Sequence, residues 1–434
     1  MNIAPNYKNP NKYNTAKYPI RQPFYLTSLI QVLSKIMLTG KKQKIEKINM
    51  QGLKPPYIVL SNHMSFVDFE LVSKITFPHR VNNVVNVDGF YKRKWLLEWI
   101  GAIGTRKFAS DIHLVRSILK VVERGDVLCM YPEACYSQCG ILSYLPPALG
   151  MLIKKAMVPV VTVVHNTNHL FAPIWDVPRK RKVPLHTVAT KVLSKEDIEN
   201  MSVDEINELL QKSLNYDSYQ YQKDNGLLIK DEYRAEGLHK VLYQCPHCKT
   251  EHKMATQGSE IYCTECGKRY IWQENGYISA VDGETEFDHI PDWFRWQKEQ
   301  VREQIKNGTY SFEDEVMVHS MPRCNRFMHL GAASLTHDIE NGFILKGFYR
   351  GSEYVIQRKP IQSYNLHVEY SYSLIKGKRD CVVLSTEDDL FYCVPKKENV
   401  VTKLAFATQI MFEIYEAEAL KSRLERRKLK EITK

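Results

Sequence analysis

The sequence predicts a chain of three parts: an α/β domain, a small cysteine-rich module, and a C-terminal β-rich domain that ends in a helix. Up to about residue 215, short apolar runs alternate with amphipathic stretches, which is typical of an α/β sheet. Two C-x-x-C pairs follow within residues 245–266. Beyond residue 310, short β-branched and aromatic runs recur between turn residues, and a long helical pattern closes the chain.

Length and composition narrow the class of protein. At 434 residues, the chain is long enough for two or three domains, each with its own core. No stretch approaches the ~18 uninterrupted apolar residues of a spanning helix, and no signal-peptide pattern opens the sequence. We therefore expect a cytoplasmic protein. Four of the ten cysteines lie in the C-x-x-C pairs, which in an unexported protein indicates metal binding in a reducing compartment.

Residues 1–54 form a basic N-terminal segment, with nine Lys and one Arg against a single Glu. Pro23 to Gly40 is predicted to be one helix, because proline begins it, glycine follows it and its apolar residues share a face. That face consists of Leu26, Leu29, Ile30, Leu33, Ile36 and Met37. It suits a helix in the interface of an anionic membrane, and equally a helix that covers the next domain. The basic run Arg179–Lys182 is predicted to face the same surface.

Residues 55–215 carry the alternating pattern of the α/β domain. The predicted strands are Tyr57–Leu60, Val84–Val87, Val127–Tyr131 and Val158–Val164. The predicted helices are Lys94–Ile100, Asp111–Arg124, a helix with a capping box at Ser194, and Ser202–Leu214.

The first strand leads into the stretch SNHMSFVD, which holds His63 and Asp68. On a regular helix, side chains five residues apart would point about 140° away from each other. The two can therefore meet only if His63 lies on the turn and Asp68 lies in the turn or at the start of the helix. The carboxylate would then fix the imidazole tautomer, as in a Ser-His-Asp relay whose hydroxyl belongs to the substrate. The alternative is a polar helix start with an unrelated histidine.

Four sequence blocks follow one another in a specific order. NHMSFVD is followed by GAIGTRK (Gly101 to Lys107), YPEACYS (Tyr131 to Ser137) and MVPVVTV (Met157 to Val163). This order resembles the glycerolipid acyltransferase family, which acylates glycerol 3-phosphate and lysophosphatidic acid. The resemblance covers about residues 20–215, roughly half of the chain.

The resemblance implies a role for each block. His63 and Asp68 would be catalytic, with His63 as the general base. Arg106, or Lys107 one position later, would bind the phosphate of the acceptor, since a guanidinium matches phosphate bidentately. An exposed pair of basic residues beside a helix is the alternative for these two. Glu133 and Ser137 would contact the substrate.

The third block departs from the family pattern of roughly Phe-Pro-Glu-Gly-Thr-Arg-Ser. This chain keeps Pro132, Glu133 and Ser137, but it has Ala134-Cys135-Tyr136 in place of the Gly-Thr-Arg segment. The glycine that lets backbone amides approach an anion and the arginine that binds phosphate are therefore missing. An acyl-cysteine intermediate at Cys135 is a further alternative to a small buried hydrophobe at that position.

We therefore predict an acyltransferase that moves a fatty acyl group from acyl-CoA or acyl-carrier protein to a lysophospholipid such as lysophosphatidic acid, in phospholipid biosynthesis. Such chemistry needs a base and donors for an oxyanion, and it needs no metal. We expect the protein to associate peripherally with an anionic membrane. The rival interpretation is a lipid- or protein-binding scaffold at the membrane whose acyltransferase domain has lost turnover.

A predicted linker, 216–240, leads to a predicted zinc ribbon, 241–275. The pairs Cys245/Cys248 and Cys263/Cys266 supply four thiolates for a closed, tetrahedral and hence structural Zn²⁺ site. Zinc ribbons often bind nucleic acid, but the basic residues of this module are too few for us to expect it.

A connecting helix, within 276–310, precedes a β-rich domain, 311–434. Strand candidates recur at Arg326–Leu330, Ala332–His337, Gly342–Tyr349, Glu353–Arg358, Tyr364–Tyr372, Asp380–Ser385 and Leu390–Val394, with turns at Asn341-Gly342 and Lys376-Gly377. A helix from Glu398 to Ile432 closes the chain. Antiparallel strands followed by a terminal helix resemble the pleckstrin-homology-like barrel, but this likeness predicts no ligand.

Overall fold

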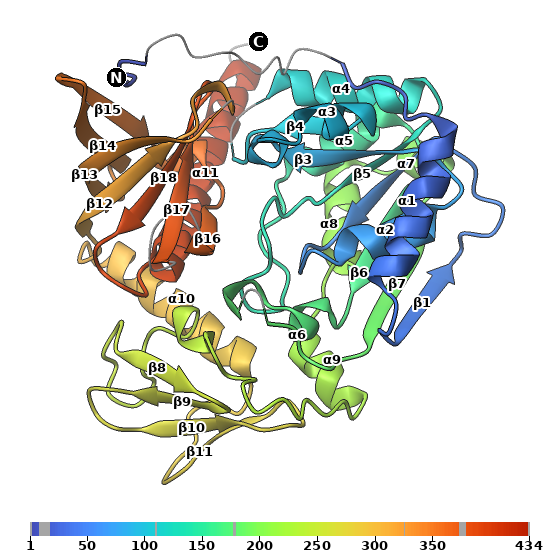
Figure 1. Cartoon of the computed structure of the whole chain (residues 1–434). Helices are drawn as coiled ribbons and strands as arrows, with labels where there is room; N and C mark the ends of the chain where they lie inside the picture. The colour runs from blue at the N-terminus through green and yellow to red at the C-terminus, as the bar shows by residue number, and fades with distance from the viewer. Residues whose placement is uncertain are drawn as a thin grey trace. The chain divides into compact units, whose positions relative to one another are not determined.

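The computed structural model describes residues 2–7, 18–108, 111–176, 179–324, 326–372 and 379–432. The chain divides into two compact units (Figure 1). One unit runs from Lys12 to Phe294, and the other joins Met1–Asn11 to Arg295–Lys434. We call them the α/β unit and the C-terminal unit.

The α/β unit is built on a mixed seven-stranded sheet of order β1-β7-β6-β2-β5-β3-β4. The strands are β1 Gln43–Ile48, β2 Tyr57–Ser61, β3 Val81–Asn86, β4 Ile103–Thr105, β5 Val127–Met130, β6 Val160–His165 and β7 Leu185–Leu193. All neighbours are parallel except β6 and β7, which are antiparallel. β1 and β7 were not predicted from the sequence, because polar residues such as lysine and threonine interrupt both and neither has a continuous apolar run.

Helices cover both faces of this sheet. The helices are α1 Phe24–Met37, α2 Asp68–Thr76, α3 Lys94–Trp99, α4 Ile112–Glu123, α5 Ala148–Ala156, α6 Asn168–Phe171, α7 Lys195–Asn200, α8 Val203–Ser213 and α9 Ser218–Asp224. On one face, α2 packs on a core that includes Val59, Val72 and Val161, and α1 packs on α2. On the other face, α4, α5, α7 and α8 contribute to a larger core. Each central strand is therefore buried on both faces.

The stretch predicted as a linker, 216–240, differs from that expectation. It contains α9, and Tyr219 at its start is completely buried together with Ile229 and Leu238. Asp217 caps the helix by accepting hydrogen bonds from two backbone amides. Of the Tyr and Gln residues that suggested an irregular, polar segment, Tyr216, Tyr219 and Gln222 are buried, Tyr221 is half-buried and Gln220 is exposed.

The cysteine-rich module follows as a small antiparallel sheet of order β11-β10-β9-β8. Its strands are β8 Met254–Gln257, β9 Glu260–Cys263, β10 Arg269–Trp272 and β11 Ile278–Ala280. The predicted connecting helix is α10, Ile290–Lys306, and its Trp293 indole donates a hydrogen bond to the carbonyl of Gln244 at 2.9 Å.

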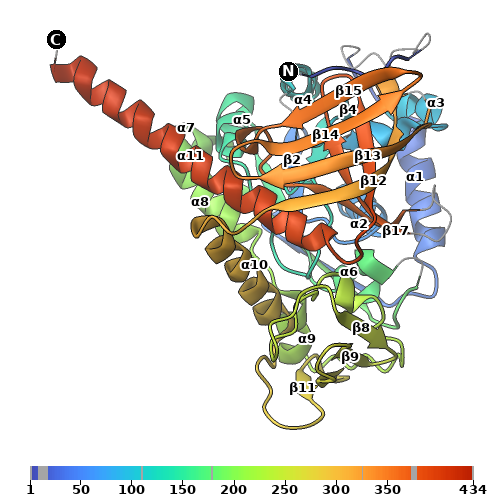
Figure 2. The same cartoon turned by 90° about the vertical axis from the view of Figure 1, so that its left-hand side faces the viewer.

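The C-terminal unit holds a second seven-stranded sheet, entirely antiparallel, of order β15-β14-β13-β12-β18-β17-β16. The strands are β12 Phe312–Ser320, β13 Met328–Asp338, β14 Gly342–Tyr349, β15 Ser352–Arg358, β16 His367–Tyr372, β17 Arg379–Ser385 and β18 Leu390–Pro395. The helix α11, Val401–Ile432, packs on β16 and β17. Figure 2 shows α11 as one long helix.

The strands of this unit differ from the prediction in two details. The acidic β12 was not predicted, and the two candidates at 326–337 form the single strand β13. The predicted turn at Lys376-Gly377 lies outside the described residues. The likeness to a pleckstrin-homology-like barrel stays a prediction.

The basic run at 179–182 does not form one surface cluster. Arg181 is 1% exposed, and its guanidinium donates to the backbone carbonyl of Arg234 at 2.7 Å and pairs with Asp176 at 3.4 Å. Arg179 also pairs with Asp176, at 2.8 Å. The interpretation of the whole run as a contact with an anionic surface is therefore wrong for Arg181.

Among the described residues, no helix has both the length and the apolar character needed to cross a membrane.

Candidate functional site

The sequence blocks meet at one edge of the α/β sheet. Because β5 and β6 pair in parallel with β2 on either side, the segments that follow these three strands lie next to one another. They carry His63 after β2, the block Tyr131–Ser137 after β5, and Asn168 after β6. The segment after β4, with Arg106 and Lys107, begins at the same edge, because β4 is parallel to β3.

His63 and Asp68 meet in the way the spacing requires. His63 lies in the turn, and Asp68 is the first residue of α2. The Nδ1 atom of His63 lies 3.0 Å from Oδ2 of Asp68. The same oxygen accepts hydrogen bonds from the backbone amides of Met64, at 2.7 Å, and Ser65, at 3.0 Å. Asp68 is completely buried, so the turn folds around its carboxylate.

Electrostatics favour an ionised Asp68 beside a neutral His63. Burial alone would raise the pKa of Asp68, but His165, His63 and the Asn168 amide outweigh burial and lower it. Burial lowers the pKa of His63; the Asp68 carboxylate opposes this shift, and the charge of Lys107 adds to it. An ionised carboxylate can only accept, so Nδ1 carries the proton and the Nε2 lone pair is free. Nε2 has no hydrogen-bond partner among the described residues, and the side chain is 19% exposed.

Two tyrosines enclose the imidazole ring of His63. The ring of Tyr131 lies 4.1 Å from it, centroid to centroid, and that of Tyr136 lies 3.8 Å from it, both inclined by 28°. Phe66, which is 73% exposed, lies 5.7 Å from the Tyr136 ring. The imidazole is therefore approached through its edge, where Nε2 lies, rather than through a face.

Glu133 follows β5, contacts the turn that holds His63, and is completely buried. Its carboxylate accepts hydrogen bonds from the amide of His63, at 3.2 Å, from the amide of Ser143, at 2.8 Å, and from the hydroxyl of Tyr216, at 3.2 Å. Burial raises the pKa of Glu133 to about 7, although the two amides partly offset this effect. With its oxygens occupied inside the protein, this carboxyl group supports the backbone at His63.

The altered third block keeps a compact turn. Ala134 adopts φ of 55°, a left-handed conformation that glycine tolerates and that costs a residue with a Cβ about 1 kcal/mol. Ser137 is buried; its amide donates to the carbonyl of His63 at 2.8 Å, and its hydroxyl donates to the carbonyl of Ile141 at 2.8 Å. Burial raises the pKa of the Cys135 thiol to about 12, which disfavours the thiolate that nucleophilic catalysis would require.

The two basic residues of the second block differ in their surroundings. The charge of Lys107 acts on both His63 and Cys135, which places it beside the site. The Nε atom of Arg106 is buried and has no hydrogen-bond partner in the described part of the chain. A buried guanidinium nitrogen without a partner is energetically costly, which makes Arg106 a candidate for pairing with an anion.

Three residues of the site were not identified from the sequence: Asn62, Asn168 and Tyr216. Asn168 donates to Oδ1 of Asp68 at 2.7 Å, and Tyr216 donates to Glu133. Asn62 accepts from the amide of His165 at 2.8 Å and so joins the turn after β2 to the end of β6. Polar residues directly after a buried strand are the available signal for Asn62 and Asn168, whereas nothing local marks Tyr216.

The four cysteines of the module form a second centre. Their ligand atoms all lie within 4.8 Å of one another, with Sγ of Cys245 3.8 Å from that of Cys266 and Sγ of Cys248 3.7 Å from that of Cys263. Each knuckle closes in a tight turn, since the amide of Lys249 donates to the carbonyl of Cys245 and that of Gly267 to the carbonyl of Cys263. Four convergent sulfur atoms fit a tetrahedral metal ion with no open position.

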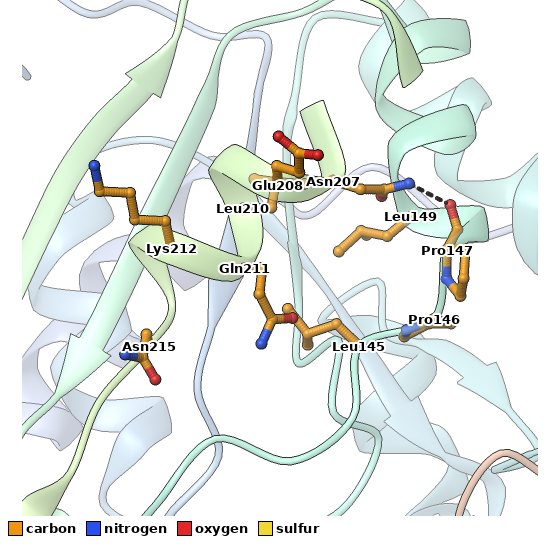
Figure 3. Close-up of a pocket in the computed structure, with 10 residues that line it drawn as sticks. All are labelled: Leu145, Pro146, Pro147, Leu149, Asn207, Glu208, Leu210, Gln211, Lys212 and Asn215. Atoms are coloured by element: carbon orange, nitrogen blue, oxygen red, sulfur yellow. Dashed lines mark hydrogen bonds between the residues drawn. The ribbon is translucent and has the colours of Figure 1, made fainter. Parts of the chain in front are cut away.

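A pocket of about 550 Å³ lies between the loop that precedes α5 and the helix α8 (Figure 3). Its wall combines Leu145, Leu149 and Leu210 with polar groups, including Lys212. Asn207 crosses from α8 to the loop, donating to the carbonyl of Pro147 at 2.9 Å. None of the site residues predicted from the sequence lines this pocket.

Comparisons with known proteins give distant similarity to solved structures only. No family model matches the sequence, and no curated protein sequence matches it. Among solved structures, the chain is similar to the 1-acyl-sn-glycerophosphate (LPA) acyltransferase PlsC from Thermotoga maritima, with a TM-score of 0.36 and 16% sequence identity. The match covers 44% of this chain and 78% of that chain. This similarity is too low to support a function, which therefore has to follow from the residues of the site.

Proposed function

We propose that the α/β unit is an acyltransferase that moves a fatty acyl group from an acyl thioester to the hydroxyl of a glycerolipid. The observation that carries this proposal is the buried Asp68 carboxylate on Nδ1 of His63, which leaves Nε2 free at the exposed edge of the ring. A relay of this kind without a nucleophilic serine suits a reaction in which the substrate supplies the hydroxyl. The resemblance of the four sequence blocks to glycerolipid acyltransferases agrees with this chemistry.

In the proposed reaction, Nε2 of His63 removes the proton of the acceptor hydroxyl as its oxygen attacks the thioester carbonyl. A new C–O bond forms, and the carbonyl electrons move to an oxyanion. The oxyanion collapses, the C–S bond breaks, and the thiolate takes the proton from His63. Asp68 stabilises the imidazolium that exists between these steps.

The neighbouring residues take separate roles in this proposal. Arg106 and Lys107 bind the negative charge of a phospholipid acceptor such as lysophosphatidic acid. Glu133 and Ser137, which the sequence suggested as substrate contacts, support the turn through the His63 backbone. Acyl-CoA and acyl-carrier protein both supply the required thioester.

We propose that the protein contacts the membrane through an exposed apolar patch. We define this patch as the outer face of α1 together with α3. Tyr25, Val32, Leu33, Ile36 and Met37 on α1 are each at least half exposed, as is Trp95 on α3. Tyr25 and Trp99 join the two helices through a ring contact of 6.1 Å. The opposite face of α1 is buried through Leu26 and Ser34. The helix therefore covers the domain with one side and offers the other to a lipid surface.

Vesicle sedimentation tests this patch. Ile36→Glu should weaken binding to anionic phospholipid vesicles several-fold, because it places a charge where apolar area would be buried next to acidic headgroups. Met151→Glu is the matched control, since Met151 on α5 is exposed to a similar extent outside the patch. Equal loss in both variants, or in neither, would remove α1 from the membrane contact.

For the cysteine centre, we propose a structural Zn²⁺ ion in a zinc ribbon. The four thiolates would hold the ion and leave it no position for substrate. Its contribution would be to fold the module, with no part in acyl transfer.

A second candidate is a membrane scaffold without turnover. Tyr136 favours it, because this ring covers one face of His63 at the position where the resemblance predicts a phosphate-binding arginine. Release of free thiol distinguishes the two functions, measured with acyl-CoA and acyl-carrier protein against a panel of lysolipids. Turnover with any pair supports the enzyme; binding of lysolipid without thiol release supports the scaffold.

A further inference from the structure

Asp68 has two carboxylate oxygens, and the turn that holds His63 supplies hydrogen-bond donors to only one of them. Oδ2 accepts from His63, Met64 and Ser65, all within the same turn. Oδ1 accepts from the Nδ2 amide of Asn168, at 2.7 Å, which comes from 100 residues further along the chain. The plane of the carboxylate is therefore set jointly by the turn and by Asn168.

Hydrogen bonds of the neighbouring residues fix the backbone at Asn168. It begins α6, is completely buried, and follows Thr167, whose hydroxyl donates to the carbonyl of Pro184 at 2.8 Å and accepts from the amide of His186 at 2.8 Å. One residue pair ties this segment to the turn of His63: the side chain of Asn62 accepts from the amide of His165. The amide of Asn168 therefore reaches Asp68 from a fixed support.

We propose that Asn168 is a positioning residue that holds the Asp68 carboxylate against His63, an inference that rests on the proposed acyl transfer for its kinetic consequence. Without this donor, Oδ1 would be a buried acceptor with no partner, which is costly for an ionised carboxylate. The proton that Asp68 keeps on Nδ1 of His63 would be held less firmly. A smaller fraction of His63 would then present a free Nε2.

The kinetic test uses Asn168→Leu, which removes the donor and keeps the branched shape of the side chain. We expect kcat to fall by ~10–100-fold with the KM for the acceptor nearly unchanged, as for other residues that orient a catalytic group. Asn207→Ala is the matched control. It also removes a hydrogen-bonded asparagine from this unit, where Asn207 accepts from Gly150 at 2.8 Å, and it should keep kcat.

The pH profile of Asn168→Asp gives a readout that a merely structural role would not move. The ionisable groups facing Asp68 are His63, Glu70, Tyr131 and His165, with Lys107 acting on His63. The new carboxyl group can donate to Asp68 only while the two share a proton, because like charges at this distance disfavour double ionisation. Activity of Asn168→Asp should therefore fall as pH rises, whereas activity of the natural protein should rise as His63 loses its proton.

Nitrogen NMR of histidine-labelled protein separates this inference from the proposed reaction. We expect the natural protein to have His63 protonated on Nδ1, and Asn168→Leu to shift its signals toward a mixture of tautomers. If thiol release is absent but this shift occurs, the acyltransferase function fails and the positioning role stands. If Asn168→Leu and Asn168→Asp both keep the kcat, the pH profile and the His63 signals of the natural protein, Asn168 has no such role.

Discussion

The His63 centre and the cysteine centre differ in the distance along the chain from which their groups come. The four sulfur atoms lie within residues 245–266, so spacing alone brings them together. The His63 centre combines a turn after β2 with groups that follow β5, β6 and α8. A local pattern can specify a closed metal site, whereas a site at a sheet edge depends on the order of the strands.

The two centres also differ in whether they leave a position open for a substrate. The sulfur atoms face one another and leave no position for a substrate. Around His63, the carboxylates of Asp68 and Glu133 accept hydrogen bonds inside the protein, whereas Nε2 of the ring has no partner among the described residues. We infer that the first centre maintains a fold and the second performs chemistry.

Removing His63 should have the largest effect. We expect His63→Ala to reduce thiol release by about 10²–10⁴-fold, because the hydroxyl would lose its base. The midpoint of thermal unfolding should change little, since Asp68 would still be held by Met64, Ser65 and Asn168. Steady-state kinetics and calorimetry on one preparation check both statements. Turnover that survives the substitution would end the proposed mechanism.

Cys263→Ser should instead destabilise the cysteine-rich module and largely spare acyl transfer. Loss of one thiolate should release about one Zn per chain and unfold residues near 241–275, because metal binding and folding are coupled in such modules. Hydrogen exchange over this range and zinc release measure the two effects. Acyl transfer should fall far less than in His63→Ala. Activity lost in proportion to zinc would show that the two centres are not separate.

Some loss of activity in that variant is nevertheless expected, because the module packs on α9. The ring of Trp272 lies 5.5 Å from that of Tyr219, centroid to centroid. Tyr216, just before α9, donates to Glu133, which in turn accepts from the amide of His63. The boundary predicted near residue 215 would therefore cut through the support of the site.

The two basic residues of the second block should separate under substitution. Arg106→Ala should raise the KM for a phosphorylated acceptor several-fold and leave that for the thioester unchanged, because its proposed role is to bind the acceptor phosphate and its Nε has no partner among the described residues. Lys107→Ala should instead raise the pKa of His63, since the charge of Lys107 lowers it. The acidic limb of the pH profile for kcat/KM would then move to higher pH. Identical effects of the two substitutions would contradict this division.

Features set by residues close together in the sequence could be predicted, whereas features set by the order of the strands could not. The meeting of His63 with Asp68 was predicted because a turn and a helix start lie within six residues. The mixed α/β sheet and the antiparallel C-terminal sheet were predicted from apolar periodicity, but β1, β7 and β12 were missed because lysines, threonines and acidic residues interrupt it. Asn168 and Tyr216 could not be assigned to the site, since their partners are set by strand order and by the packing of α9.

The smallest effect concerns the pH dependence of stability through Glu133. Its pKa is about 7 in the folded protein because of burial, against about 4.5 for an exposed glutamate. Between these pH values the folded state binds more protons than the unfolded state. The contribution of Glu133 to stability is therefore greatest below pH 4.5 and is lost as pH rises toward 7. Glu133→Gln cannot ionise and should lack this contribution. Unfolding midpoints of both proteins between pH 5 and 8 test the sign: relative to the variant, the natural protein should become less stable as pH rises. Parallel profiles would mean that Glu133 is already ionised within its hydrogen bonds, and its support of the His63 backbone would then be that of a charged acceptor.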